Sequence, residues 1–160
     1  MTIKPGDKIP TTNLSIMGKD GPKMVKTDEL FKGKKIALFG LPGAFTPTCS
    51  AQHVPSYVKN ASSLKAKGID RIICMSVNDC FVMDAWGKEK GVLDKIIMAA
   101  DGSSLFTKAL GLELDLTERG MGMRCQRFSM IVDDCIVKIL NHEPPGEYRI
   151  SSAEYMIDQL

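Results

Sequence analysis

One cysteine of this chain, Cys49, lies where an apolar segment gives way to the start of a helix. Thr46 is a good N-cap, and Pro47 suits the first helical position because its missing N–H would have no partner there. Cys49 then falls in the first turn, where unpaired backbone N–H groups favour a negative charge. Since a thiolate at a helix N-terminus is a reactive thiolate, the spacing predicts that Cys49 is a nucleophile.

The other cysteines and the histidines narrow the chemistry that this nucleophile can serve. The chain has five cysteines in irregular spacing: Cys49, Cys74, Cys80, Cys125 and Cys135. An odd number without a C-x-x-C pair disfavours both a disulfide-rich secreted scaffold and a disulfide oxidoreductase. His53 and His142 are the only histidines, and neither lies in zinc-ligand spacing with a cysteine. A zinc site is therefore disfavoured.

Size and charge point to an ordinary globular protein. With 160 residues and a net charge of +2, the chain can bury a full core and has no basic run that would attract nucleic acid or an anionic membrane. We predict a single domain over residues 1–160. The first residues lack the apolar core of a signal peptide, and no segment reaches transmembrane length. These features predict a cytoplasmic location.

Strand and helix patterns alternate along the chain. Lys35 to Leu41 holds a short continuous apolar run, which is typical of a strand buried on both faces. We expect a helix from Pro47 to Lys67, kinked by Pro55 and ended by Gly68. Further strands are predicted at Ile72–Val77, Ile96–Ala100, Arg127–Val132 and Ile136–Asn141, and further helices at Phe81–Lys90, Leu105–Leu110 and Ser152–Gln159. Parallel strand–helix–strand units followed by an antiparallel hairpin predict an α/β fold with a mixed sheet.

The pattern Pro42-x-x-x-Thr46-x-x-Cys49 resembles the active-site signature of the peroxiredoxins. Residues 39–50, 76–83 and 127–132 are similar to the type II branch of that family, and residues 109–116 to its plant-like members. The resemblance covers almost the whole chain and implies a thioredoxin-like three-layer α/β/α sandwich. It also implies a thiol-dependent peroxidase that reduces hydrogen peroxide and organic hydroperoxides. No metal, flavin or haem cofactor is expected, because the cysteine supplies the chemistry.

The resemblance implies one role for each of four residues. Cys49 would attack the peroxide O–O bond and become a sulfenic acid. Thr46 would position the peroxide and hydrogen-bond the thiolate through its hydroxyl. Arg127 would hold the thiolate and the peroxide oxygens with its fork of N–H donors. Pro42 would shield the site from water.

The energetics of thiolate formation also favour a role for Arg127. A free cysteine has a pKa of about 8.5, and lowering a thiol pKa to about 6 takes roughly 3.4 kcal/mol, at about 1.36 kcal/mol per unit. A helix end supplies about 0.3–1 kcal/mol, or about 2 kcal/mol when partly buried. A charged hydrogen bond adds roughly 1.5–3 kcal/mol. The helix end and Arg127 together reach the required stabilisation, whereas the helix end alone does not.

The sequence leaves open how a sulfenic acid at Cys49 would be resolved. Residues 146–152, in the region where some type II members carry a resolving cysteine, contain none. Plant-like members place one in the strand that matches the surroundings of Cys74, so Cys74 is the intramolecular candidate, with an inert buried cysteine as the alternative. Cys125, two residues before Arg127, would share a face with it in a strand. Otherwise an external thiol must act, either glutathione with glutaredoxin or thioredoxin.

Two features around the site have alternative interpretations. Type II members are usually homodimers packed through loops near the active site, and Phe45 and Phe81 are either contacts of this kind or core residues. His53, four residues after Cys49, lies on the same helical face. It either tunes the site or is satisfied by local backbone groups.

Two other functions are compatible with the same fold. A redox sensor or relay would use Cys49 but pass its oxidation to a partner protein, so it would oxidise once and then require that partner. A thioredoxin-like binding module without activity would have no need of Pro42, Thr46, Cys49 and Arg127 together. The intact set of four therefore favours the peroxidase.

Overall fold

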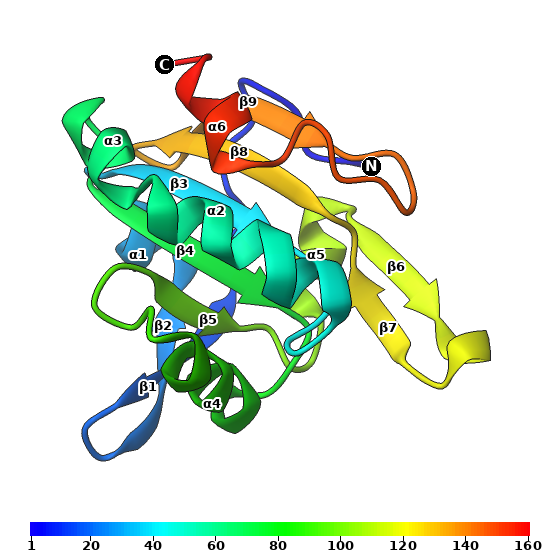
Figure 1. The fold of residues 1–160 in the computed structure, drawn as a ribbon. Coiled ribbons are helices and arrows are strands. Elements are labelled where there is room, and N and C mark those ends of the chain that lie inside the picture. Colours follow the sequence, from blue (N-terminus) through cyan, green and yellow to red (C-terminus); the bar gives the residue numbers. More distant parts are fainter.

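A seven-stranded mixed sheet forms the centre of the computed structural model, which describes residues 1–160 (Figure 1). Its strands are β1 (Asn13–Gly18), β2 (Gly21–Lys26), β3 (Lys35–Gly40), β4 (Arg71–Ser76), β5 (Ile97–Ala100), β8 (Phe128–Asp133) and β9 (Ile136–His142). They lie in the order β2-β1-β5-β4-β3-β8-β9. β3, β4 and β5 are parallel, and all other neighbouring pairs are antiparallel. This is the mixed sheet predicted from the order of elements.

Helices cover both faces of the sheet and give three layers. One face carries α2 (Val54–Lys59), α3 (Ala61–Ala66), α4 (Cys80–Lys90) and α6 (Ala153–Ile157), and the other carries α1 (Thr27–Phe31) and α5 (Leu105–Leu110). Figure 1 shows α2, α3 and α6 in front of the sheet. The three-layer arrangement implied by the resemblance is therefore present. None of the helices has both the length and the apolar character needed to span a bilayer.

The central strands divide the buried apolar residues into two clusters, which we name the α2-side core and the α5-side core. In β3, Ala37 and Phe39 belong to the α2-side core, whereas Ile36 and Leu38 belong to the α5-side core. Successive side chains of a strand point to opposite faces, so a strand covered on both sides needs apolar residues at every position. The continuous apolar run predicted this strand for that reason.

The helix predicted from Pro47 to Lys67 begins at Pro47 but is interrupted twice. Its first interruption is a π-turn, η1 (Cys49–His53), in which the N–H of Val54 donates to the carbonyl of Cys49. Such wide turns mark irregular points of a helix, and this one ends two residues before Pro55, which has no N–H to donate. The π-helical turn thus lies in the turn that carries the cysteine, and the kink at Pro55 stays a prediction.

The second interruption separates α2 from α3 at Asn60. After α3, Gly68 adopts φ +96°, and the N–H groups of Gly68 and Ile69 donate to the carbonyls of Lys65 and Leu64. Glycine adopts this left-handed conformation without the penalty that a side chain would bring. The helix end predicted at Gly68 is therefore confirmed.

Two hairpins were not predicted from the sequence. One is β1–β2, and the other pairs β6 (Glu113–Leu116) with β7 (Gly122–Cys125) across a short 3-10 turn, η2 (Thr117–Arg119). Their strands are half-buried or exposed at nearly every position, so they lack the continuous apolar runs that reveal the central strands. The β6–β7 hairpin projects from the end of the sheet beyond β8 (Figure 1), and it forms one wall of the candidate site.

Candidate active site

Cys49 lies in the first turn of the helix that follows β3, as predicted, and its side chain is fully buried. The N–H of Ser50 donates to the carbonyl of Thr46 at 2.9 Å, whereas the N–H of Cys49 has no acceptor in the protein. Unpaired N–H groups are expected in the first turn of a helix. The sulfur therefore lies next to a free backbone donor.

Arg127 faces the sulfur of Cys49 and donates to it from Nη2 at 3.2 Å. It lies directly before β8, which pairs with β3 so that Phe128 is opposite Gly40. This register places Arg127 at the edge of the sheet where β3 ends and the chain enters the Cys49 helix. The guanidinium also lies near the ring of Tyr148, with Cζ 5.8 Å from the ring centre. Pairing of two sheet strands thus brings together two residues 78 positions apart.

His53 holds the other end of the Arg127 guanidinium. Nη1 of Arg127 lies 2.8 Å from Nδ1 of His53, and Nε2 of His53 lies 2.9 Å from the carbonyl oxygen of Ser151. A guanidinium can only donate and a carbonyl can only accept, so Nδ1 is the acceptor and Nε2 carries the proton. Complete burial, together with the positive charge of Arg127, lowers the pKa of His53 to about 3. The ring is therefore neutral.

The two interpretations of His53 raised by the sequence both describe part of what the structure contains. The ring contacts Arg127 beside the sulfur, and it is also satisfied by a backbone carbonyl. That carbonyl belongs to Ser151, 98 residues away, and not to a local group. Tyr57, one helical turn after His53, donates to the same carbonyl from Oη at 3.1 Å.

Thr46 makes neither of the two hydrogen bonds predicted for its side chain, one as an N-cap and one to the sulfur of Cys49. Its hydroxyl instead donates to the carbonyl of Gly43 at 2.7 Å. The reason is the preceding residue, Phe45, whose φ of +64° turns the chain back toward Gly43. With its hydrogen engaged, the Thr46 hydroxyl oxygen is left as an acceptor.

A second arginine, Arg124, fastens the loop that carries Pro42. It donates from Nε to the carbonyl of Met121 at 2.8 Å and from Nη1 to the carbonyl of Pro42 at 3.3 Å. The guanidinium lies against Gly43, where a Cβ would be only 2.6 Å from Nη1. Arg124 was not predicted from the sequence. The Pro42 loop is thus tied to β7.

A cavity of about 550 Å³ adjoins these groups. Its walls are the loop from Pro42 to Thr48, the β6–β7 hairpin and residues 143–147. Thr46 and Arg127 line the cavity, but Cys49, which has no exposed surface, does not. A small molecule in the cavity would therefore contact Thr46 and Arg127, while the sulfur is shielded from bulk water.

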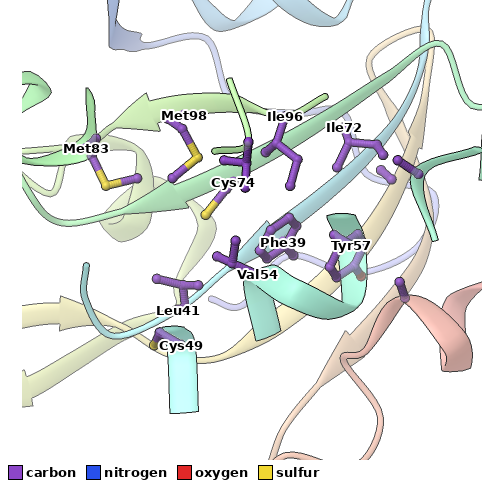
Figure 2. Packing of buried hydrophobic residues seen from close by; sticks show 14 of the residues in the cluster. Phe39, Leu41, Cys49, Val54, Tyr57, Ile72, Cys74, Met83, Ile96 and Met98 are labelled. Atoms are coloured by element: carbon purple, nitrogen blue, oxygen red, sulfur yellow. The ribbon is translucent and has the colours of Figure 1, made fainter. Parts of the chain in front are cut away.

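Cys74, on β4, is buried in the same α2-side core as Cys49. The two cysteines form neither a disulfide nor a hydrogen bond with each other. In the view of Figure 2, the side chains of Leu41 and Val54 lie between the two cysteines. Burial raises the pKa of the Cys74 thiol well above its usual range, and the neighbouring Cys49 adds to this. Cys74 is therefore a buried neutral thiol in this conformation.

Cys125 does not share a face with Arg127, because β7 ends at Cys125 and the chain then turns into β8. Its side chain lies in the α5-side core, across the sheet from Cys49. The thiol donates to the carbonyl of Gln126 at 3.2 Å, and burial raises its pKa to about 12. The second candidate thiol is thus turned away from the site.

Comparison with known proteins adds to this geometry. The Redoxin family model matches residues 4–157. The chloroplastic Peroxiredoxin-2E of Arabidopsis thaliana is 47% identical over 163 residues, which cover 99% of this chain and 70% of that protein. The structure of reduced Prx3 from Vibrio vulnificus in complex with hydrogen peroxide gives a TM-score of 0.95 at 47% identity, covering 99% of both chains. The antioxidant protein of Plasmodium falciparum, a 1-Cys peroxiredoxin, gives a TM-score of 0.89 at 32% identity, covering 98% of both.

These similarities confirm the thioredoxin-like fold and do not favour the sensor alternative. The family match spans the β3 strand, the Cys49 helix and the strand that follows Arg127. The chain therefore belongs to the peroxiredoxins, within their type II branch, and is a thiol-dependent peroxidase.

Proposed function

We propose that Cys49 is the peroxidatic cysteine and that Arg127 stabilises its thiolate. The observation that carries this proposal is the hydrogen bond of 3.2 Å from Nη2 of Arg127 to Sγ of Cys49. A guanidinium that faces a sulfur favours the thiolate over the thiol, and the thiolate is the nucleophile. The neutral His53 supports the same role, because it holds Arg127 without competing for the sulfur.

The reaction moves negative charge from sulfur to oxygen. The Cys49 thiolate attacks the terminal oxygen of a hydroperoxide, the S–O bond forms, and the O–O bond breaks. Sulfur loses two electrons and becomes a sulfenic acid, while the departing alkoxide or hydroxide takes a proton from water. Arg127 and the free N–H of Cys49 donate to the oxygens as they gain charge. The Thr46 hydroxyl, already donating to Gly43, accepts from the terminal O–H of the peroxide.

Pro42 keeps the reacting atoms dry in this proposal. Pro42 lines the cavity, and its carbonyl accepts a hydrogen bond from Arg124. Exclusion of water strengthens the electrostatic interaction between Arg127 and the sulfur. The shared position of Pro42, Thr46 and Arg127 on the cavity wall supports the roles proposed for them.

We also propose that an external thiol resolves the sulfenic acid, with glutathione and glutaredoxin preferred over thioredoxin. Support comes from the cysteines themselves, because all five are free and buried and Cys74 lacks thiolate character. An external thiolate attacks the Cys49 sulfur, the S–S bond of a mixed disulfide forms, and the S–O bond breaks. The departing hydroxide takes a proton from the solvent and leaves as water. A second thiol then releases Cys49. The cavity of about 550 Å³ offers room for a small thiol.

Turnover in the presence of defined reductants tests this cycle. Hydrogen peroxide consumption is followed with glutathione and glutaredoxin, or with thioredoxin and its reductase, for the wild type, Cys74→Ser and Cys49→Ser. We expect turnover with glutathione and glutaredoxin in the wild type and in Cys74→Ser, and none in Cys49→Ser. Cys80→Ser, outside the site, is the control for a general effect of removing a thiol. Loss of turnover in Cys74→Ser alone would reject the external-thiol cycle.

A homodimer through the face that holds Phe45 and Phe81 is a further proposal. Phe45 and Phe81 are 53% and 66% exposed. Phe81 also lines a second cavity of about 280 Å³ together with the exposed side chains of Met24 and Leu105. Exposed apolar patches of this kind mark interaction surfaces. Sedimentation analysis should give a dimer for the wild type and a monomer for Phe81→Glu, and a monomeric wild type would reject the proposal.

A cytoplasmic location and a single domain over residues 1–160 also stay proposals. The relatives include a chloroplastic form, so the test is to locate this protein in the cells that produce it. Imaging of the tagged full-length protein, with fractionation as the control, should place it in the cytoplasm. Enrichment in an organelle would reject that location.

A further inference from the structure

Glu143 carries a buried carboxyl group that the chemistry above does not use. It follows β9 directly and is 3% exposed. Its Oε2 accepts hydrogen bonds from the N–H groups of Arg149, Ile150 and Ser151 at 2.7, 2.8 and 2.9 Å, and from the Ser151 hydroxyl at 2.7 Å. Its Oε1 has no partner in the protein. All four hydrogen bonds of the Glu143 carboxylate thus fall on one of its two oxygens.

The segment that Glu143 anchors ends at the carbonyl that fixes His53. Three consecutive N–H groups, those of residues 149–151, converge on one oxygen, so the peptide planes that lead to Ser151 are held in one orientation. The Ser151 carbonyl then accepts from Nε2 of His53 at 2.9 Å and from Oη of Tyr57 at 3.1 Å. The residue that carries this carbonyl is therefore held by Glu143 through both its N–H and its hydroxyl.

Glu143 and Arg127 do not form an ion pair with each other. The backbones of the two residues do meet, since the N–H of Glu143 donates to the carbonyl of Arg127 at 3.0 Å. A substitution of the Glu143 side chain leaves this backbone bond in place. Glu143 also lines the cavity beside Arg127, so a substitution can reach the sulfur either across the cavity or through the anchored segment. Only the second route changes the hydrogen bonding of the His53 ring.

We propose that Glu143 is a positioning residue for Cys49. It acts through the Ser151 carbonyl, the His53 ring and the Arg127 guanidinium in turn. With the carbonyl in place, the imidazole keeps its proton on Nε2 and presents a free Nδ1 to the guanidinium, which then points Nη2 at the sulfur. If the carbonyl turns away, Nε2 loses its acceptor, and a proton moved to Nδ1 opposes the guanidinium donor. This inference rests on the proposed function of Cys49.

Two substitutions of Glu143 and one control test the relay. Glu143→Ala removes the acceptor, and Glu143→Gln keeps the shape but replaces a carboxylate oxygen with a weaker amide acceptor. Glu154→Gln removes a carboxylate from an exposed position of α6, in the same C-terminal segment. Two readouts need no turnover: the rate at which iodoacetamide alkylates Cys49 at neutral pH, and the nitrogen NMR shifts of the His53 ring. The first follows the thiolate, and the second reports the tautomer.

We expect Glu143→Ala to slow alkylation of Cys49 about tenfold, the equivalent of about 1.4 kcal/mol, and to move the His53 ring from one tautomer to a mixture. Glu143→Gln should have an intermediate effect on both readouts, and Glu154→Gln should match the wild type. A folded Glu143→Ala with the wild-type tautomer and alkylation rate would overturn the proposal.

Glu143→Gln decides the question if Glu143→Ala does not fold. A lowered melting temperature in Glu143→Gln with an unchanged tautomer and alkylation rate would assign Glu143 a purely structural role and overturn the relay. A failure of the proposed peroxidase cycle is recognised separately. It would show as a wild type that does not consume peroxide, whereas the tautomer of His53 is measured without any substrate.

Discussion

Arg127 and His53 share a hydrogen bond of 2.8 Å in which the guanidinium donates and Nδ1 of the imidazole accepts. This bond fixes the other ring nitrogen as the protonated one, because Nε2 faces the carbonyl of Ser151. The imidazole therefore holds the arginine without bringing a second positive charge into the core. Held at one end, Arg127 directs its other nitrogen to the sulfur of Cys49.

Loss of the Arg127 guanidinium should slow the reaction with peroxide. Arg127→Gln removes the charge while keeping a polar side chain, and we expect the second-order rate constant with hydrogen peroxide to fall about 10- to 100-fold. A charged hydrogen bond contributes about 1.5–3 kcal/mol, and about 1.4 kcal/mol is a factor of ten. Stopped-flow kinetics measure this loss, and iodoacetamide alkylation of Cys49 should slow in parallel.

Arg71→Gln is the matched control for that substitution. Arg71 lies at the start of β4, opposite the start of β3, so it occupies the far end of the sheet from Cys49. We expect both rates of Arg71→Gln to equal those of the wild type. Wild-type rates in Arg127→Gln would reject the stabilising role of the guanidinium.

The buried neutral His53 should make the protein less stable as the pH falls. The pKa of His53 is lowered to about 3 in the folded protein, against about 6.5 in an unfolded chain. Between these values the unfolded chain binds a proton that the folded protein does not. The contribution to stability is therefore fully present above about pH 6.5 and is lost toward about pH 3, by about 1.4 kcal/mol per pH unit.

Denaturant unfolding of the wild type, His53→Gln and His142→Gln across that range measures this contribution. Carboxyl groups add to the slope in all three proteins, so the difference between them is the informative quantity. We expect a shallower dependence on pH in His53→Gln than in the other two proteins. The same dependence in all three would mean that His53 is not buried in its neutral form.

A side chain at Gly43 should act on the site through Arg124. In Gly43→Ala the new Cβ would lie 2.6 Å from Nη1 of Arg124, which is the far end of a flexible side chain. We expect the protein to fold, with a loss of about 1–3 kcal/mol in the free energy of unfolding. Peroxide reduction should fall as well, because the displaced guanidinium releases the carbonyl of Pro42.

A double-mutant cycle shows whether Arg124 transmits that effect. In the Arg124→Ala background there is no guanidinium for the Cβ of Gly43→Ala to displace. Thr46 Cγ2 is the next atom, at 3.3 Å. The two substitutions together should therefore reduce activity little more than Arg124→Ala alone. Fully additive losses would contradict this coupling.

The elements that position the site were predictable from the sequence, because their signals are local. β3 is apolar at every position after Lys35, which a strand covered by helices on both faces requires. α5 begins and ends where predicted, at Leu105 and Leu110, and Gly111 closes it with φ +71°. Placement of Cys49 in a first helical turn followed from Pro47 in the same way.

The contacts that complete the site were not predictable, since they join residues far apart in the chain. His53 meets Ser151 across 98 positions, and neither residue carries a local pattern that indicates the other. Glu143 and Arg124 were missed for the same reason. Thr46 was assigned the wrong hydrogen bonds because Phe45 adopts a positive φ, which a residue with a large side chain rarely does.

The intact mass of the reduced protein after one equivalent of hydrogen peroxide, without added thiol, tests the role of Cys49 most directly. The wild type and Cys74→Ser are compared, and peptide mapping locates the change. We expect both to gain one oxygen at Cys49, because Cys74 is a buried neutral thiol. Loss of two hydrogens in the wild type, with oxygen gain only in Cys74→Ser, would make Cys74 the resolving cysteine and contradict the external-thiol cycle. No change at Cys49 in either protein would contradict its role as the peroxidatic cysteine.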